Sequence, residues 1–426
     1  MDQSDPAGSQ TQATRIWSNE RMPSVETPPC ETPVQQELKM SSSKPPIVWS
    51  NVVFFALINL AAFILVPLWG LMHGYSGWAW FFFALFLVLS GMSITVGYHR
   101  LWAHHSFKAR APLRWMLAVF GGMALQNSIL NWAARHRVHH RYVDDVTRDP
   151  HSIKAGFWHA HMGWMLREWP TTEADYSRVK DLEKDPIVMW QHRHYWTLVW
   201  VMNLGLPLAL GLLVGDVIGM LLLAVALRLT LSHHFTFFIN SLAHLWGRRP
   251  YSDENTAVDN EAVALLTWGE GYHNYHHAFQ ADYRNGVAWW HYDPSKWLIN
   301  LCAWCGLAYD RRRTPAFRIQ KARLAVQFRR LQRLAETSTV QDNWRGALER
   351  EQQRFCETVN RWQEVQAQMV QAGRAAMTDR WLKAELRTSF KELEYRLKMQ
   401  RRRLHVLTAE LNRRVRSCLS PPLVSG

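Results

Sequence analysis

Cysteine is scarce in this chain of 426 residues, which contains only Cys30, Cys302, Cys305, Cys356 and Cys418. Five thiols are too few, and odd in number, for a disulfide framework. Cys302 and Cys305 form a lone CxxC pair, which cannot supply the four ligands that close a structural zinc site. The chain also lacks a basic start followed by an apolar core, so residues 1 to 45 do not resemble a signal peptide. Their Ser, Thr, Pro, Gln and Glu content predicts a disordered segment.

Mean hydropathy is slightly negative, but this average hides a strong contrast along the chain. A run of about 20 mostly apolar residues is long enough to span a bilayer as a helix. Four such runs form two hairpins with short turns: Asn51 to Met72 with Trp78 to Tyr98, and Thr197 to Gly215 with Val217 to Ile239. We therefore expect an all-α membrane protein with four transmembrane helices. Arg228 lies inside the fourth run, where it must face protein or reach the interface.

Between the hairpins lies a polar segment, Arg100 to Tyr195, in which Lys and Arg outnumber Asp and Glu. The positive-inside rule places this segment in the cytoplasm, together with both termini and the region after Ile239. In a bacterium the membrane would be the inner one. Within the polar segment, Leu113 to Leu125 is apolar but too short to span, so we expect an interfacial or buried helix there.

The residues from about Arg311 onward are strongly charged, and their apolar residues recur every three to four positions: Leu393, Leu397, Leu404, Leu411 and Val415. This rhythm is typical of an amphipathic or coiled-coil helix. The sequence thus predicts a disordered segment over 1–45, a transmembrane domain with a cytosolic cap over 46–310, and a helical extension over 311–426. A net charge of +14 favours contact with anionic lipid or phosphate-bearing substrates. We expect no nucleic-acid partner.

Histidine is abundant, with 20 residues, and two short stretches share one spacing. The stretch His136 to His140 reads HRVHH and the stretch His273 to His277 reads HNYHH. Imidazoles at i, i+3 and i+4 lie on one face of a helix. His99 and His104 follow the second span in HRLWAH, and His244 follows the fourth in NSLAH. Nine histidines exceed the four ligands of a zinc site and suit two metal ions close together.

Carboxylates are few near these stretches, where the candidates are Asp144, Asp145, Asp149 and Glu270. Soluble di-iron bundles use mainly carboxylates as ligands. A largely neutral imidazole set would leave two metal ions strongly cationic, which favours binding of anionic, reduced oxygen. The ligand set therefore suits activation of O2 and oxidation of a strong C–H bond.

Four motifs together resemble the histidine boxes of membrane-bound fatty acyl desaturases: GYHRLWAHHSFKA, RHRVHHRYVDDVTRDPHS, NSLAHLWGRRPY and GEGYHNYHHAFQADYRNG. The resemblance is strongest to the acyl-CoA delta-9, or stearoyl-CoA, desaturases, and it runs from about Val48 to Arg311. It implies four spans and a cytosolic helical cap that holds a di-iron centre, with O2 as co-substrate. One iron would be held by His99, His104, His136, His140 and His276. The other would be held by His139, His244, His273 and His277, with Asn240 reaching it through a water. The family pattern assigns no metal to His105, His159, His161, His233 and His234.

The resemblance also implies a bent tunnel that carries the acyl chain past the irons, with CoA on the basic cytosolic surface. The matching substrate contacts are Asn51, Asn127, Trp132, Phe237 and Arg167. The family often reads WARDHR before its second box, but this chain reads WAARHR, so Ala134 replaces a basic contact with CoA. CoA is the expected acyl carrier, with a phospholipid or acyl carrier protein as alternatives. Candidates for the tunnel wall are Ser93, Val96 and Gly97.

The implied reaction inserts a cis double bond, at the delta-9 position, in fatty acid biosynthesis. It needs two electrons, and the sequence contains no haem or iron–sulfur motif. The expected donor is therefore an external ferredoxin, or a small b-type cytochrome with its reductase. Two alternatives remain: a di-iron hydroxylase of alkanes or lipids, and a membrane metal transporter or sensor that is not an enzyme. A transporter places its ligands near the bilayer midplane, whereas these histidines lie in polar segments.

Overall fold

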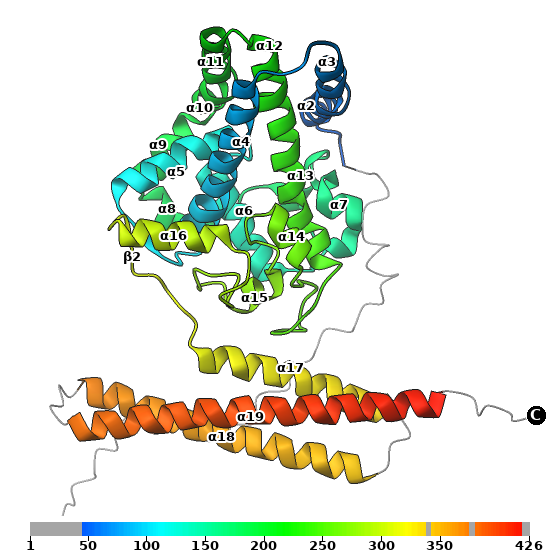
Figure 1. Cartoon of the computed structure of the whole chain (residues 1–426), viewed down its shortest axis with the longest axis vertical. Coiled ribbons are helices and arrows are strands. Elements are labelled where there is room, and N and C mark those ends of the chain that lie inside the picture. The colour runs from blue at the N-terminus through cyan, green and yellow to red at the C-terminus, as the bar shows by residue number, and fades with distance from the viewer. Residues whose placement is uncertain (1–44, 338–341, 375–379, 420–426) are drawn as a thin grey trace, which may run out of the picture. The chain divides into compact units, whose positions relative to one another are not determined.

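The structure, a computed structural model, describes residues 45–337, 342–374 and 380–419. The chain divides into two compact units, Met1–Pro46 and Ile47–Gly426, and the following description concerns the second. Apart from Pro45, the segment 1–45 for which disorder is predicted lies outside the described residues. The described residues are mainly helical, with one antiparallel pair of strands, β1 (Lys108–Ala109) and β2 (Ala308–Tyr309), which confirms the predicted all-α class (Figure 1).

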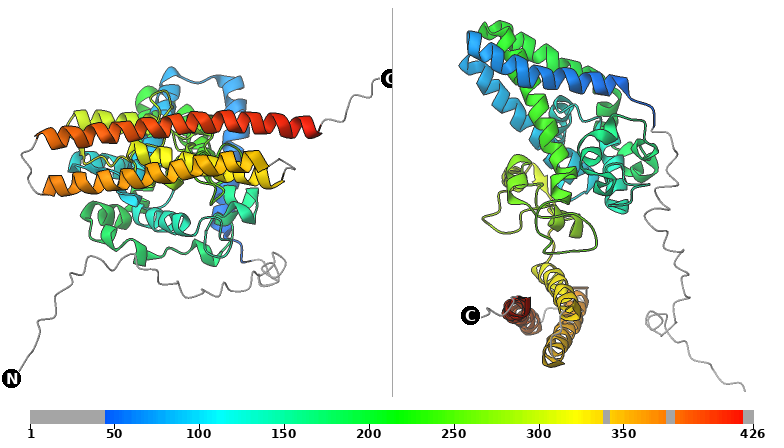
Figure 2. Two further views of the ribbon diagram at one scale, coloured as in Figure 1. Left: turned by 90° about the horizontal axis from the view of Figure 1, so that it is seen from below. Right: turned by 90° about the vertical axis from the view of Figure 1, so that its right-hand side faces the viewer.

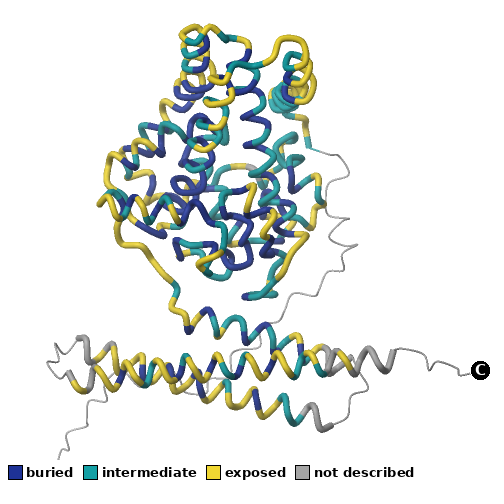
Figure 3. The backbone as a smooth tube through the Cα atoms, in the orientation of Figure 1, coloured by how far each residue is buried: buried dark blue, intermediate teal, exposed yellow. Residues whose placement is uncertain are grey.

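Four helical segments are long and apolar enough to cross a membrane: Trp49–His73, Gly77–Ala103, Tyr195–Val214 and Val217–His244. They confirm the four predicted spans. The second and fourth spans continue beyond their apolar runs, so that their last turns carry polar residues. These two spans are also the more buried pair, whereas exposed apolar side chains such as Leu71 and Leu213 cover the outer faces, as lipid contact requires (Figure 3).

Each span is built from several helical pieces, among which η1, η2, η7 and η8 are π-helical. The first two spans comprise α2 (Trp49–Leu60), η1 (Ala61–Leu65), α3 (Val66–His73), α4 (Gly77–Met92) and η2 (Ser93–Ala103). The last two comprise α10 (Tyr195–Trp200), η7 (Val201–Gly205), α11 (Leu206–Val214), α12 (Val217–Gly219), η8 (Met220–Leu227), α13 (Arg228–Asn240) and the 3-10 turn η9 (Leu242–His244).

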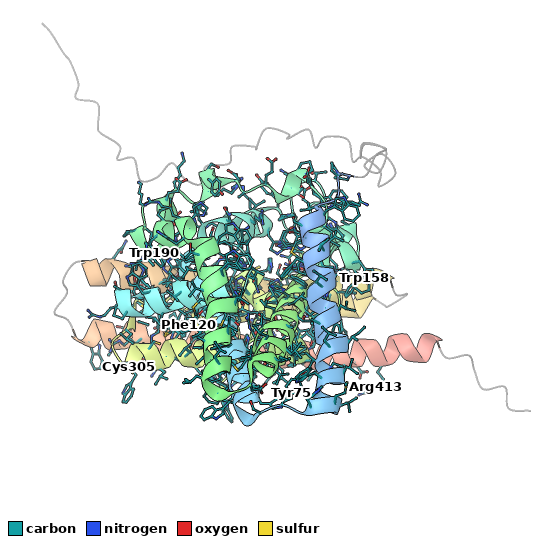
Figure 4. All side chains as sticks on the ribbon, turned by 90° about the horizontal axis from the view of Figure 1, so that it is seen from above. Tyr75, Phe120, Trp158, Trp190, Cys305 and Arg413 are labelled. Carbon is teal, nitrogen blue, oxygen red and sulfur yellow. The ribbon has the colours of Figure 1, made fainter. Side chains whose placement is uncertain are left out.

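The turns of the two hairpins are joined by hydrogen bonds. Tyr75, labelled in Figure 4, donates from its hydroxyl to the carbonyl of Val66 at 2.7 Å. The carboxylate of Asp216 accepts from the backbone N–H groups of Gly219 at 2.8 Å and of Ser76 at 3.1 Å. Asp216 therefore caps the start of the fourth span and ties it to the start of the second.

Arg228 faces protein rather than lipid. Its guanidinium is fully buried and donates to the carbonyls of Met123 at 2.6 Å and Ala224 at 3.0 Å, and to Asn203 Oδ1 at 2.6 Å. These acceptors satisfy the donors of a cation that would be costly in hydrocarbon. The interaction joins the third and fourth spans to the helix that begins the cap.

The cap consists of short helices from the two polar segments. Between the hairpins lie α5 (Ala111–Met123), α6 (Ile129–Tyr142), η3 (Ile153–Ala155), α7 (Phe157–His161), η4 (Gly163–Met165), η5 (Pro170–Thr172), η6 (Tyr176–Arg178), α8 (Lys180–Glu183) and α9 (Pro186–Arg193). After the fourth span come α14 (Glu261–Leu266), α15 (His273–Ala278) and α16 (Pro294–Trp304). The predicted short apolar helix is present as α5, which buries one face. Cys302 in α16 is buried and Cys305 is exposed, and both are free thiols.

Three long helices follow the cap: α17 (Ala316–Thr337), α18 (Asp342–Arg374) and α19 (Arg380–Leu419). They share an apolar core that includes Phe317, Phe328, Trp362, Leu397 and Leu404. Figure 2 shows α18 and α19 running side by side. The predicted helical extension is therefore present, and Leu393, Leu397 and Leu404 are buried as their rhythm predicts. The side chains of Leu411 and Val415 lie outside the described residues.

Candidate metal centre

Nine histidines converge from four separate segments at the polar ends of the second and fourth spans. His99 lies in η2, His104 is the residue directly after η2, and His244 lies in η9. The cap helices α6 and α15 contribute the others: His136, His139, His140, His273, His276 and His277. All nine are buried or half-buried.

Local structure explains how α6 and α15 present their imidazoles. Ser128 begins α6, because its hydroxyl accepts from the backbone N–H of Asn131 at 3.3 Å. The HRVHH and HNYHH stretches then lie in α-helices, where residues at i, i+3 and i+4 share a face. The two helices turn these faces toward one another, and His276 Nε2 lies 3.0 Å from His140 Nε2.

The second span uses a different geometry. His99 and His104 are five residues apart, and in an α-helix that spacing would separate them by about 140°. Here His99 lies in the π-helix η2, whose hydrogen bonds join residues five positions apart, and His104 caps the end of that helix. The backbone N–H of His104 bonds to the carbonyl of His99 at 3.1 Å, and the two rings are 4.8 Å apart between centroids. The wider helical turn thus brings both imidazoles to one side.

The imidazoles form two groups, in each of which one ligand atom per residue lies within 4.8 Å of all the others. The first group consists of His99, His104, His136, His140 and His276. The second consists of His139, His244, His273 and His277. These groups have the same membership as the two ligand sets implied by the family resemblance.

The nitrogens that meet inside each group are Nε2 atoms. In the first group, His99 and His276 approach to 3.0 Å and His104 and His136 to 2.7 Å. In the second group, His273 Nε2 lies 3.1 Å from the Nε2 atoms of both His244 and His277. Such convergence of one kind of nitrogen is the arrangement that a bound cation requires.

In three of the nine histidines, the other ring nitrogen, Nδ1, lies within hydrogen-bond distance of a carboxylate or a hydroxyl. The Nδ1 atoms of His99 and His139 lie 2.8 Å from Glu270 and 2.9 Å from Asp149, respectively. His244 Nδ1 lies 2.8 Å from the hydroxyl of Thr256, which in turn donates to Asp144. A partner at Nδ1 fixes the tautomer that leaves Nε2 as an acceptor. His139 Nε2 is then buried without a hydrogen-bond partner among the described residues, which fits a metal ligand.

Six of the nine histidines are held neutral by their surroundings. Burial and the neighbouring imidazoles lower the pKa of six histidines well below the usual value: His104, His136, His140, His273, His276 and His277. Metal ions bind the neutral form of imidazole. Burial opposes ionisation of Glu270, but its interactions with His99 and Arg100 outweigh this effect and lower the Glu270 pKa to about 2. Glu270 is therefore a carboxylate at neutral pH.

Sequence reasoning missed the roles of three polar residues near the centre. Asp149 and Glu270 are identified in the sequence only as nearby acids, and Thr256 is not singled out there. A third cluster joins His139, Asp149 and His151, and the ring of His151 lies 4.3 Å from that of His139. Their closeness in the sequence to the histidine stretches could have indicated these roles. Asp149 and His151 follow HRVHH within one motif, and Glu270 lies three residues before the first histidine of HNYHH.

A cavity borders the histidine groups. Its polar end includes His99, His136, His139, His273 and Asn240. The remainder is lined by Gly91, Ile94, Thr95, Gln126, Trp132, Ser232, Phe235, Thr236, Ile239, Thr267, Trp268 and Glu270. The cavity thus joins the ends of the second and fourth spans to the proposed metal ligands.

Comparison with known proteins identifies the family. A family model described as fatty acid desaturase matches residues 76–313, which is more than half of the chain. The chain belongs to the fatty acid desaturase family. This desaturase domain contains all nine histidines of the two groups.

Three relatives illustrate the range of the desaturase family. The probable acyl-CoA desaturase of Schizosaccharomyces pombe is 44% identical over 268 residues, 63% of this chain and 54% of the relative. The Delta(9)-fatty-acid desaturase fat-7 of Caenorhabditis elegans is 39% identical over 285 residues, which are 66% of this chain and 83% of the relative. The Acyl-CoA Delta12-desaturase of Acheta domesticus is 37% identical over 315 residues, which are 68% of this chain and 85% of the relative. The chain spans about half the length of the fission-yeast relative.

The tunnel wall predicted for the desaturase fold does not line this cavity. Val96 packs in the apolar core, and a Cβ at Gly97 would lie 3.0 Å from Trp102. Ser93 is buried elsewhere. The second span instead contributes Gly91, Ile94 and Thr95. Ser93, Val96 and Gly97 all lie in the π-helix η2, and their place in the wall of an acyl tunnel stays a prediction.

The predicted substrate contacts of the desaturase occupy different places. Trp132 lines the cavity and stacks on His136, with ring centroids 4.6 Å apart. Asn127 lies beside the cavity residue Gln126 and accepts from Asn131 at 2.7 Å. The remaining three, Asn51, Phe237 and Arg167, lie outside the cavity lining. Ala134, which replaces the basic residue of the family motif, is fully buried.

Asn51 and Arg167 lie on neighbouring segments of the desaturase. Asn51 Nδ2 donates to the carbonyl of Met165 at 2.7 Å, and Arg167 forms a backbone bridge with Ile47. Phe237 instead packs between the rings of Phe55 and His161, in the membrane-spanning part of α13. Asn51 and Arg167 therefore lie beside the first span, apart from the residues that line the cavity.

Proposed function

We propose that this protein is an oxygen-dependent acyl-CoA desaturase that inserts a cis double bond, at the delta-9 position, into a long-chain fatty acyl thioester. The observation that carries the proposal is the pair of histidine groups at the wall of a largely apolar cavity. Similarity to proteins named acyl-CoA desaturase and Delta(9)-fatty-acid desaturase supports the substrate class and the bond position.

We infer that two iron ions occupy the two groups, with Asn240 reaching the second ion through a water. Imidazole suits iron among other transition metals. When bound, the irons supply activation of O2. The overall reaction converts R–CH2–CH2–R′, O2, two electrons and two protons into R–CH=CH–R′ and two waters. The electrons would come from a ferredoxin, or from a b-type cytochrome with its reductase.

The residues of the chain supply position and exclude water. Ile94, Phe235 and Ile239 offer apolar contacts that hold a methylene chain along the cavity. Trp132 closes the side next to His136. Asp149 and Glu270 hold the rings of two proposed ligands, so that their Nε2 atoms keep facing the cavity end. Selectivity for one carbon pair would follow from where the chain is held.

We propose CoA as the acyl carrier and the cytoplasm as the side of the cap. Asn51 and Arg167 lie on the polar surface beside the first span, where a head group could bind. Asn127, Trp132 and Phe237 would contact the acyl part. The buried Ala134 leaves this chain without the basic contact that the family motif has there. A phospholipid or acyl carrier protein would change these head-group contacts but not the reaction.

The test is a fatty-acid profile of a desaturase-deficient host that expresses this chain or its His139→Ala variant. We expect monounsaturated acyl chains with a delta-9 double bond from the intact chain alone. Hydroxy fatty acids would show a hydroxylase instead. Identical profiles with and without the intact chain, at equal expression, would contradict the proposal.

Filling the cavity should impair long substrates without affecting the metal centre. Ile94→Trp adds a large ring inside the cavity and is expected to reduce conversion of 18-carbon chains by about tenfold or more, because the chain can no longer be positioned. Iron content should stay unchanged. Val88→Trp is the matched control, since Val88 lies on the same span but is exposed at the lipid face. Equal losses in both variants would show a general effect on the span.

A further inference from the structure

The positive charge of this chain is concentrated in one segment. Residues 311–426 contain 26 Lys and Arg against 11 Asp and Glu, whereas residues 1–310 contain 23 against 24. The match to the desaturase family model ends at residue 313. The excess charge is therefore a property of the extension and not of the desaturase domain.

The extension packs against the helix that carries three of the nine histidines. Ile319 of α17 shares an apolar cluster with Tyr251 and with Tyr275 of α15, the residue before His276. The rings of Tyr251 and Tyr275 are 5.0 Å apart between centroids. Arg323 of α17 donates to the Tyr251 hydroxyl and lies 4.8 Å from the centre of its ring. Two aromatic rings thus connect α17 to the metal-centre helix.

Several cations gather beside Tyr251, where α17 and α19 meet the loop after the fourth span. Arg330 donates to the carbonyl of Arg249 at 2.6 Å, and Arg401 of α19 donates to Gln320 of α17 at 3.4 Å. We call this set the cationic seam: Arg249, Arg323, Arg330 and Arg401. The same loop exposes Leu245 and Trp246. An apolar patch with a charged rim is typical of a protein docking interface.

The apolar residues of the extension are already used in its own core. The three helices bury residues such as Leu324, Leu331, Val365, Leu386 and Leu393 against one another. A helix that lies on a membrane, or pairs as a coiled coil, needs a continuous apolar face for its partner. Among the described side chains of α19, the large exposed apolar ones are scattered: Trp381, Tyr395 and Val406. This surface therefore attracts a partner mainly through charge.

We propose that the cationic seam is the docking site of a small acidic one-electron carrier protein of the iron–sulfur or haem class. The inference rests on the proposed desaturase function, because that reaction consumes two electrons for each double bond. Each docked carrier is oxidised by one electron, so two successive encounters supply the pair. Opposite charges speed such weak redox encounters. The seam lies over buried Tyr251, whose ring contacts that of Tyr275, the residue before His276, so a carrier on the seam is close to the metal-centre helix.

The test measures binding, using the full-length protein as purified in nanodiscs and an acidic [2Fe–2S] ferredoxin as the probe. The Arg330→Glu/Arg401→Glu variant reverses two charges of the cationic seam, of which the first is exposed and the second half-buried. Arg361→Glu/Arg396→Glu is the matched control, since these exposed residues line the groove between α18 and α19 and change the net charge equally. We expect Kd to rise about tenfold for the seam variant and less than about twofold for the control, with wild-type binding weakened by salt.

Three results would overturn the proposal. Equal weakening by both variants would show association by net charge without a site. Undetectable binding of ferredoxin to the wild-type protein at low salt would remove the partner. Protection of α19 amides from hydrogen exchange in anionic-lipid nanodiscs, without ferredoxin, would make the membrane the partner instead.

A second measurement covers variants that fail to fold. Cross-linking of ferredoxin to the wild-type protein should join it to residues 245–251 and to α17 or α19, and cross-links confined elsewhere would refute the site. Product formation driven by dithionite separates the docking site from the proposed function. The seam variant should keep this chemically driven activity in full, whereas its absence in the wild-type protein would count against the desaturase function itself.

Discussion

Replacing His104 by alanine is expected to abolish unsaturated product and to lower the iron content from about two ions per chain to about one. His104 brings its Nε2 to within 2.7 Å of His136 Nε2 in the group of five. The variant leaves that group with a gap in its ligand set and leaves the second group complete. Fatty-acid profiles and metal analysis of the purified protein measure the two effects separately.

The adjacent residue provides the matched control. His105 is exposed, and its ring lies 2.7 Å from Asp181 and outside both groups. Its backbone has φ of 50°, so asparagine is the suitable replacement because it tolerates this conformation. We expect His105→Asn to retain product and about two irons. Loss of iron in both variants, or unchanged iron in His104→Ala, would refute the assignment of His104.

Glu270→Ala should have the next largest effect, because one carboxylate serves both the metal centre and the fold. Glu270 lies 2.8 Å from His99 Nδ1 and 2.9 Å from a nitrogen of Arg100, and it accepts from Asn285 at 2.6 Å. Without it, buried Arg100 keeps the carboxylate of Asp293, at 3.0 Å, and the carbonyl of Tyr283, at 2.8 Å, but loses one of its two counter-charges. We expect a loss of about 3 kcal/mol in stability and a 10- to 100-fold loss in metal affinity, roughly.

Thermal unfolding of the metal-free protein and iron titration distinguish these two consequences. Glu270→Gln keeps the shape and one acceptor but loses the charge. It should therefore recover part of the metal affinity, while the unbalanced charge of Arg100 keeps the protein less stable than wild type. If Glu270→Ala unfolds at the wild-type temperature and binds iron as tightly, the carboxylate does not position His99.

Local periodicity explains why much of the architecture could be predicted from the sequence. Uninterrupted apolar runs of span length can only be buried in lipid or a large core, so the four spans were visible without tertiary information. Spacing alone also placed three imidazoles on one face of α6 and three on one face of α15, because both stretches are α-helical. Membership of the two groups came from the family resemblance, since no local rule says which distant helices meet.

The missing part depends on backbone geometry and long-range contacts. The sequence HRLWAH does not reveal that η2 is π-helical, so it could not predict that Ile94 and Thr95, rather than Ser93, Val96 and Gly97, line the cavity. The contacts of Glu270 with His99 and of Thr256 with His244 join distant segments, so the sequence offers only nearby polar residues. The partners of Arg228 were likewise hidden, because the cost of a charge in lipid left two alternatives, contact with protein or extension to the interface.

Assembly of the centre from four segments has a consequence for the life of the protein in the cell. His99 and His276 meet although they are 177 positions apart. An ion bound between them would cross-link the polypeptide across that distance, and it would favour the folded chain by mass action. Protein molecules made during iron starvation would lack this cross-link and would unfold more often. Their unfolded chains would then be degraded by proteases. Iron supply would then govern how much of the protein survives, as well as how fast it works.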